Sequence, residues 1–71
     1  MILLKSLIGK EFYLNPDLIY KIEREYDTLI TLTDQKTLWV QETPELVKNK
    51  IVEYKRQIYI QSLEVQEWKE V

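Results

Sequence analysis

The chain has 71 residues, and its ten basic and twelve acidic side chains leave a formal charge of −2. It contains no cysteine and no histidine, which excludes disulfides, thiolate nucleophiles, and the commonest general base and transition-metal ligand. We therefore expect no cofactor, no metal and no enzymatic activity. A chain of this length buries only about 60% of its unfolded surface, so we also expect a homo-oligomer, because association is the remaining source of added stability.

The charge balance and the distribution of apolar residues restrict the partners and the compartment. Without an overall positive field, nucleic acid is not an expected partner. The start of the chain is interrupted by Lys5, Ser6 and Gly9 and does not resemble a signal peptide. No apolar run approaches the roughly 20 residues that cross a bilayer. These features predict a cytoplasmic protein.

Three strands are predicted in the first part of the chain. Residues 2–7 form an apolar run that is too short for a helix and is closed by Gly9. Residues 11–14 continue as a second strand. Apolar and charged side chains alternate over residues 18–23, which is the pattern of a half-buried third strand.

Two further strands are predicted before the period changes. Residues 28–33 alternate β-branched and aliphatic side chains, which suits a pleated surface, and residues 36–41 return as a fifth strand. Asp34 and Gln35 lie between them. Glutamine disfavours the positive φ that a two-residue hairpin loop requires, so we expect a longer loop here.

A helix is predicted after the fifth strand. Thr43 is a good N-cap, Pro44 suits the first helical position, and Glu45 complements the positive end of the helix dipole. Apolar residues then recur at intervals of four, three and four, as on one face of an amphipathic helix. These residues are Val47, Ile51, Tyr54 and Ile58.

The elements together predict an α+β fold, with a small antiparallel, strongly twisted sheet of about five strands followed by one C-terminal amphipathic helix. We assign residues 1–60 to a single domain. Residues 61–71 are a C-terminal extension that either continues the helix or forms a disordered tail. The apolar stripe of the helix reaches Val65 and Trp68 within it.

The polar triplet of Asn15, Pro16 and Asp17 lies between the second and third predicted strands. Proline fixes φ, and asparagine and aspartate side chains bond to nearby backbone groups, so the triplet predicts a turn. A catalytic role would need an activating base, and a calcium loop would need more oxygen ligands at close spacing. We interpret the triplet as a structural turn.

A series of short motifs runs through the first part of the chain, including a Met-Ile start, Leu-Asn-x-Asp-x-Ile, Ile-Glu and Ile-Thr-Leu. In order and spacing they resemble the FlbD family of small flagellar proteins, also called SwrD in swarming bacilli, over about the first 60 residues. Three turn positions, Ile8, Tyr26 and Gln35, depart from the family pattern. The matching residues are Met1, Ile2, Leu7, Gly9, Leu14, Asn15, Asp17, Ile19, Ile22, Glu23, Asp27, Thr28, Ile30, Thr31, Leu32, Val40 and Glu42.

The resemblance implies a non-enzymatic, cytoplasmic protein of bacterial flagellar operons. It further implies a role in swarming motility through motor torque, with a flagellar motor or stator protein as partner. Such a protein would lie at the flagellar base, close to the inner membrane surface. No catalytic residues come with the resemblance, which leaves Asn15 and Asp17 as a structural signature.

The alternation of the strands divides their apolar residues between two sides of the predicted sheet. One side should meet the helix, and its residues are Ile2, Leu4, Phe12, Leu14, Tyr20, Ile22, Ile30, Leu32, Leu38 and Val40. The other side should be polar in a sheet with one solvated face, yet it carries about one large apolar residue per strand. These are Leu3, Tyr13, Ile19, Leu29 and Trp39, the candidate interaction face.

Three arrangements would cover this face: closure of the sheet into a small barrel, a second subunit, or the tail residues Leu63, Val65 and Trp68. Scattered apolar surface residues also occur without any function. The helix offers a second candidate docking face for an acidic partner or an anionic membrane surface, formed by Lys48, Lys55 and Arg56. An ordinary solvated helix face is the competing interpretation.

A small β-domain that binds nucleic acid in post-transcriptional control is the alternative function. Tyr13 and Trp39 could stack on bases, as aromatic residues do on other β-surfaces. Few basic residues lie near enough to contact phosphates, and they are Lys5, Lys10, Lys21 and Lys36. The sequence therefore favours a protein partner.

Overall fold

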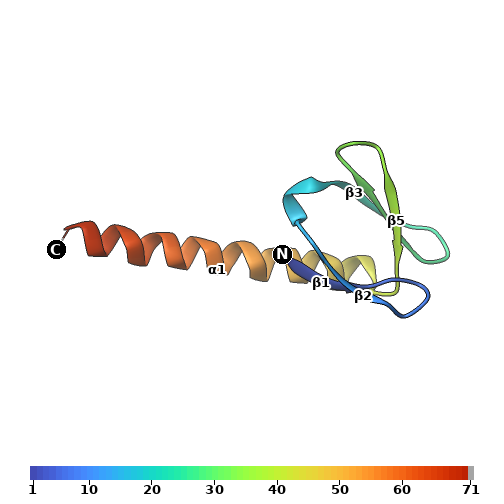
Figure 1. The fold of residues 1–71 in the computed structure, drawn as a ribbon, viewed down its shortest axis with the longest axis horizontal. Helices are drawn as coiled ribbons and strands as arrows, with labels where there is room; N and C mark the ends of the chain where they lie inside the picture. The colour runs from blue at the N-terminus through green and yellow to red at the C-terminus, as the bar shows by residue number, and fades with distance from the viewer. Residues whose placement is uncertain (71) are drawn as a thin grey trace.

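The computed structural model describes residues 1–70, with side chains described for residues 1–61. Five antiparallel strands precede a single long helix (Figure 1), so the predicted α+β fold is confirmed. A single-turn 3₁₀ helix, η1 (Pro16–Leu18), separates the second and third strands. The other elements are β1 (Ile2–Lys5), β2 (Glu11–Leu14), β3 (Ile19–Arg24), β4 (Thr28–Leu32), β5 (Thr37–Val40) and α1 (Pro44–Glu70).

The strands are divided between two sheets, β1–β2 and β3–β4–β5. The sheets meet at one corner, where Ser6 forms an isolated antiparallel bridge with Val40. Just beyond it, the backbone N–H of Gln41 donates to the carbonyl of Lys5 at 2.8 Å. The chain therefore leaves β1 alongside the end of β5, and this contact holds the two sheets around one core.

The core is built from the alternate residues of the strands and one face of the helix. Residues 2, 4 and 14 come from the first sheet, residues 30 and 40 from the second, and Val47 from α1. Leu4, Ile30, Val40 and Val47 have no accessible surface. The partly buried side chains packed around them are Phe12, Ile19, Ile22, Leu32, Leu38, Ile51 and Tyr54.

Strand β3 departs from the predicted alternation. Tyr20, predicted to face the core, is 72% exposed, whereas Ile19, predicted on the opposite side, packs against the core. The cause is a register shift between Ile19 and Lys21 in the pairing with β4. Such a shift breaks the period-two alternation, so side chains on its two sides no longer follow one pattern. Ile22 keeps its predicted inward position.

Two of the hairpin loops share one architecture. In the β1–β2 hairpin the third loop residue is Gly9, whose N–H donates to the carbonyl of Ser6 at 2.9 Å. In the β4–β5 hairpin the third loop residue is Gln35, whose N–H donates to the carbonyl of Leu32 at 2.9 Å. Both residues have positive φ, 86° for Gly9 and 71° for Gln35. This is the three-residue hairpin loop that favours glycine at its last position. The expectation of a loop longer than two residues at Asp34 and Gln35 is therefore confirmed.

The helix begins where the sequence predicts. The hydroxyl of Thr43 accepts a hydrogen bond from the Leu46 N–H at 3.1 Å, and its carbonyl accepts one from Val47 at 2.9 Å. Pro44 is the first helical residue. A side-chain acceptor at this position satisfies one of the N–H groups that the first turn leaves without a partner.

Only the first part of α1 covers the sheets. Val47, Ile51 and Tyr54 pack on the core, whereas Ile58, the next residue of the predicted stripe, is 44% exposed. The helix has passed the edge of the sheets at this point, and it projects from the β-strands along the 52 Å long axis of the molecule (Figure 1). The predicted tail contacts of Leu63, Val65 and Trp68 lie outside the described side chains.

Candidate interaction surface

The triplet of Asn15, Pro16 and Asp17 forms the turn into η1. Asn15 is the N-cap, and its Oδ1 accepts a hydrogen bond from the Asp17 N–H at 3.0 Å. Pro16 is buried at the first position of η1, where a missing N–H costs nothing. The Asn15 carbonyl accepts from Leu18 at 3.1 Å. The triplet thus uses its polar groups to turn the chain from the first sheet into the second.

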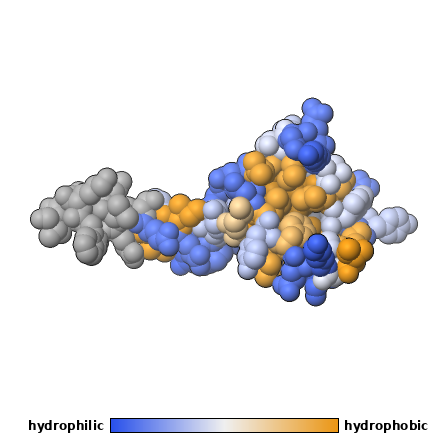
Figure 2. All heavy atoms as spheres, in the orientation of Figure 1, coloured by the Kyte–Doolittle hydropathy of each residue, from blue (hydrophilic) through white to orange (hydrophobic). Residues whose placement is uncertain are grey.

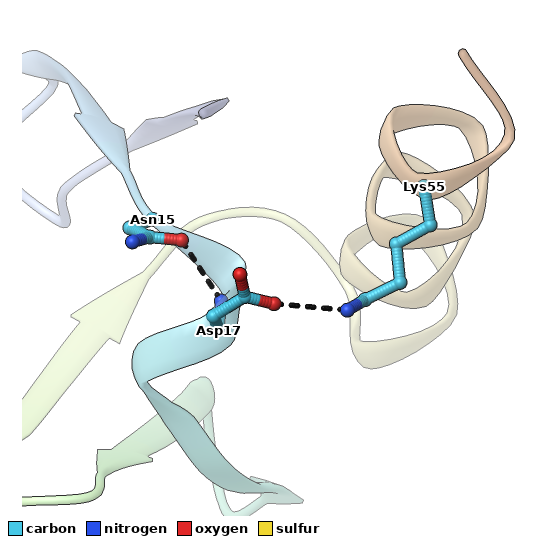
Figure 3. A network of polar contacts seen from close by, with 3 residues as sticks. All are labelled: Asn15, Asp17 and Lys55. Carbon is cyan, nitrogen blue, oxygen red and sulfur yellow. Dashed lines mark hydrogen bonds and ion pairs between the residues drawn. The ribbon is translucent and has the colours of Figure 1, made fainter. Parts of the chain in front are cut away.

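The Asp17 side chain does something further, which the sequence does not indicate. Its Oδ1 lies 2.9 Å from Lys55 Nζ, so the turn is tied to the middle of α1 (Figure 3). Both side chains remain more than half exposed. An exposed pair of this kind contributes about 0.2–1 kcal/mol to stability, so it adjusts the position of the helix rather than holding the fold together.

A groove of about 340 Å³ lies beside this ion pair. Its walls combine the charged pair with apolar and aromatic side chains of the helix, and its lining residues are Asp17, Tyr54, Lys55, Ile58 and Tyr59. The carboxylate and the ammonium already neutralise each other. The remaining chemistry suits an apolar side chain of a partner, with polar groups at the rim.

A second polar cluster holds the helix start against both sheets. The Glu42 side chain accepts a hydrogen bond from the Lys5 N–H at 3.0 Å, and its carbonyl accepts one from the hydroxyl of Thr28. Thr28 is the one buried polar residue in the described part of the chain. Sequence reasoning found Glu42 and Thr28 only as matches to a family pattern. Their contacts join β1, β4 and the connection to α1.

Four of the five residues of the predicted interaction face form two cross-strand pairs, and the fifth packs against the core. Leu3 lies directly opposite Tyr13 on the first sheet, and Leu29 lies directly opposite Trp39 on the second. Tyr13 is 70% exposed and Trp39 is 43% exposed. Ile19 belongs to the core, as described above. The face is therefore two aromatic–aliphatic pairs on separate sheets.

The predicted docking face on the helix is also partly occupied. Lys55 is engaged by Asp17, and Arg56 Nη1 lies 4.0 Å from the Glu53 carboxylate one turn earlier. Among the described side chains, Lys48 has no ion-pair partner. Lys48 and Arg56 are thus the residues of this face whose charge remains most available to a partner.

Two properties of the described residues bear on other kinds of site. Within residues 1–61, no group of three or more acidic side chains gathers in a way that could hold a metal ion. Among the described residues, no helix combines the length and the apolar character needed to cross a bilayer. The chemistry that the surface does offer is exposed apolar area beside single charges, which is the chemistry of recognition.

Comparison with known proteins gives one match. Residues 1–59 match the model of a family described as FlbD, flagellar and swarming motility proteins. No curated protein and no solved structure matches the chain. The matched region includes both sheets, the triplet turn and the part of α1 that carries Lys55 and the groove.

Proposed function

The chain belongs to the FlbD family of flagellar and swarming motility proteins, and on that premise we propose that it is a non-enzymatic accessory protein of the flagellar motor. It acts by binding, with a stator component as the target. Its place is the cytoplasmic side of the flagellar base, close to the inner membrane surface. Binding of this kind would support swarming by raising motor torque.

The two exposed aromatic–aliphatic pairs carry this proposal. Tyrosine and tryptophan are the residues that most often dominate the energy of a protein interface, because each buries a large apolar area at little cost in side-chain entropy. In this chain Tyr13 and Trp39 are both exposed and each is backed by an aliphatic partner on the neighbouring strand. Exposed aromatic side chains of this kind favour binding to another protein.

The same residues give little support to nucleic acid as a partner. Stacking of successive bases requires aromatic side chains that share one platform, and Tyr13 and Trp39 lie on different sheets. The whole chain also carries a net negative charge. We therefore do not extend the proposal to RNA or DNA.

Deletion of the gene in the source bacterium tests the proposed function. We expect mutant cells to assemble normal numbers of filaments but to swim and swarm more slowly, because the motor lacks an accessory factor. Filament number is counted by microscopy, and the speed of filamented cells is measured in the same cultures. Loss of filaments would contradict the proposal and assign the protein to assembly, and unchanged speed with normal filaments would contradict any role in the motor.

A further inference from the structure

The part of α1 just beyond the sheets is apolar on more than one side. Ile58, Tyr59 and Ile60 are 44%, 65% and 45% exposed. Successive residues of an α-helix point about 100° apart, so these three side chains together surround most of the helix. Figure 2 shows apolar atoms on the helix where it emerges from the body of the molecule. A helix that is apolar on several sides is normally covered.

The side of α1 that faces away from the sheets continues this surface toward the start of the helix. Val52 and Tyr59 are seven residues apart and therefore lie on one side of the helix, and both are exposed. Exposed basic side chains border them, Lys48 on one flank and Arg56 on the other. Apolar side chains one heptad apart and bordered by charges suit contact with a second helix.

The charges along the helix sequence change sign near residue 60. Residues 44–61 contain four basic and two acidic side chains, whereas residues 62–71 contain three acidic and one basic. The basic residues are Lys48, Lys50, Lys55 and Arg56, and the acidic residues of the second part are Glu64, Glu67 and Glu70. One helix therefore carries both halves of a complementary pair.

We propose that two copies of the chain associate through their α1 helices in an antiparallel pair that crosses near Tyr59. In this arrangement the basic part of each helix lies beside the acidic part of the other, and the two helix dipoles oppose each other favourably. The midpoint between the basic and acidic groups falls at about residue 59–60, within the apolar segment. The charges and the exposed apolar residues thus select the same crossing point.

A parallel pair has neither advantage. It would place basic residues beside basic residues and acidic beside acidic, and like charges that face each other across a helix seam are unfavourable. The antiparallel pair also leaves the Asp17–Lys55 contact intact, because Lys48 and Arg56 supply the available positive charge. This pairing is independent of the motor function, and it is tested by the association of the purified protein.

Charge reversal tests the pairing by sedimentation equilibrium of the full chain. We expect a dimer for the native protein, and dimerisation weakened about tenfold or more for K48E/R56E and for E64K/E67K, because attractive contacts become repulsive. A mixture of the two variants should recover the dimer, since each reversed group then meets its opposite. A native monomer at high micromolar concentration, or a dimer that both variants leave unchanged, would overturn the proposal.

Cysteine cross-linking tests the orientation, and the absence of native cysteine makes it unambiguous. When two antiparallel helices cross at residues 59–60, position 52 of one helix lies beside position 67 of the other. A mixture of V52C and E67C chains should therefore form the mixed disulfide under mild oxidation. Predominant V52C–V52C cross-links, or cross-links no faster than between chains carrying I8C on the first hairpin, would overturn the antiparallel pair.

Discussion

The carboxylate of Asp17 and the ammonium of Lys55 lie 2.9 Å apart, although 38 residues separate them in the chain. The first belongs to the turn between the two sheets and the second to the middle of α1. The contact therefore adjusts the position of the helix relative to the turn, and it borders the groove where Ile58 first becomes exposed. A turn that the sequence explains by local chemistry alone also helps to position the surface that the helix presents.

Removal of this ion pair should have a small and salt-dependent effect. We expect Lys55→Met to lower the free energy of unfolding by no more than about 1 kcal/mol at low ionic strength, because both groups are exposed. The difference from the native protein should shrink in high salt. Urea unfolding at two salt concentrations measures it. Arg56→Met, which removes the looser contact with Glu53, should cost less, and an equal or larger loss there would contradict this account.

The cap of η1 should contribute more than the ion pair. Asn15→Ala removes the acceptor for the Asp17 N–H and should lower the free energy of unfolding by about 1 kcal/mol. Asn15→Ser keeps an acceptor and should retain most of the stability. Asn49→Ala, at an exposed position inside α1, is the matched control and should be neutral or slightly stabilising. Equal effects at residues 15 and 49 would show that the cap is unimportant.

Gly9 and Gln35 occupy equivalent positions in the β1–β2 and β4–β5 hairpins, so glycine can be removed from one and introduced into the other. Gln35 has a φ of 71°, which is unfavourable for a residue with a side chain, so Gln35→Gly should raise the free energy of unfolding by about 1 kcal/mol. Gly9→Ala should lower it by a similar amount, and for conformational reasons alone, because nothing lies within 4 Å of the added Cβ. Thermal or urea unfolding of the two variants should move in opposite directions. A shift of the same sign in both would contradict the shared loop geometry.

Loss of the hydrogen bond between Thr28 and Glu42 should lower the free energy of unfolding, because Thr28 is buried. Thr28→Val keeps the shape of the side chain but removes the hydroxyl, and it should cost about 1 kcal/mol or more by leaving the Glu42 carbonyl without its partner. Thr31→Val, on the same strand at a less buried position, is the control and should be near neutral. Comparable losses in both variants would assign the effect to the substitution itself and not to the contact.

The elements that could be predicted from sequence are those determined by local chemistry. The second strand at residues 11–14 and the helix start at Thr43 and Pro44 agree with the structure because alternation and capping each depend on a few neighbouring residues. The longer loop at Gln35 was predicted correctly, but its premise that glutamine avoids positive φ is wrong here, because Gln35 has a φ of 71° within the three-residue loop. In each case the signal lies within a few residues of the feature.

The features that could not be predicted depend on distant parts of the chain. The register shift beside Ile19 reversed the sides of two residues, and a single irregularity leaves no mark in an alternating pattern. Ile58 continues the helical stripe correctly, but its exposure depends on where the sheets end. The Asp17–Lys55 pair and the separation of Tyr13 from Trp39 likewise follow from how the two sheets and the helix meet.

The proposed support of motility depends on the exposed pairs around Tyr13 and Trp39. The most direct test is the swimming speed of filamented cells in which the native gene is replaced by Y13S/W39S, with the fully exposed Tyr26→Ser as control and urea unfolding as a check that both proteins fold. We predict normal filaments and the reduced speed of the deletion strain for Y13S/W39S, and native speed for the control. Full speed in cells carrying folded Y13S/W39S would contradict the claim.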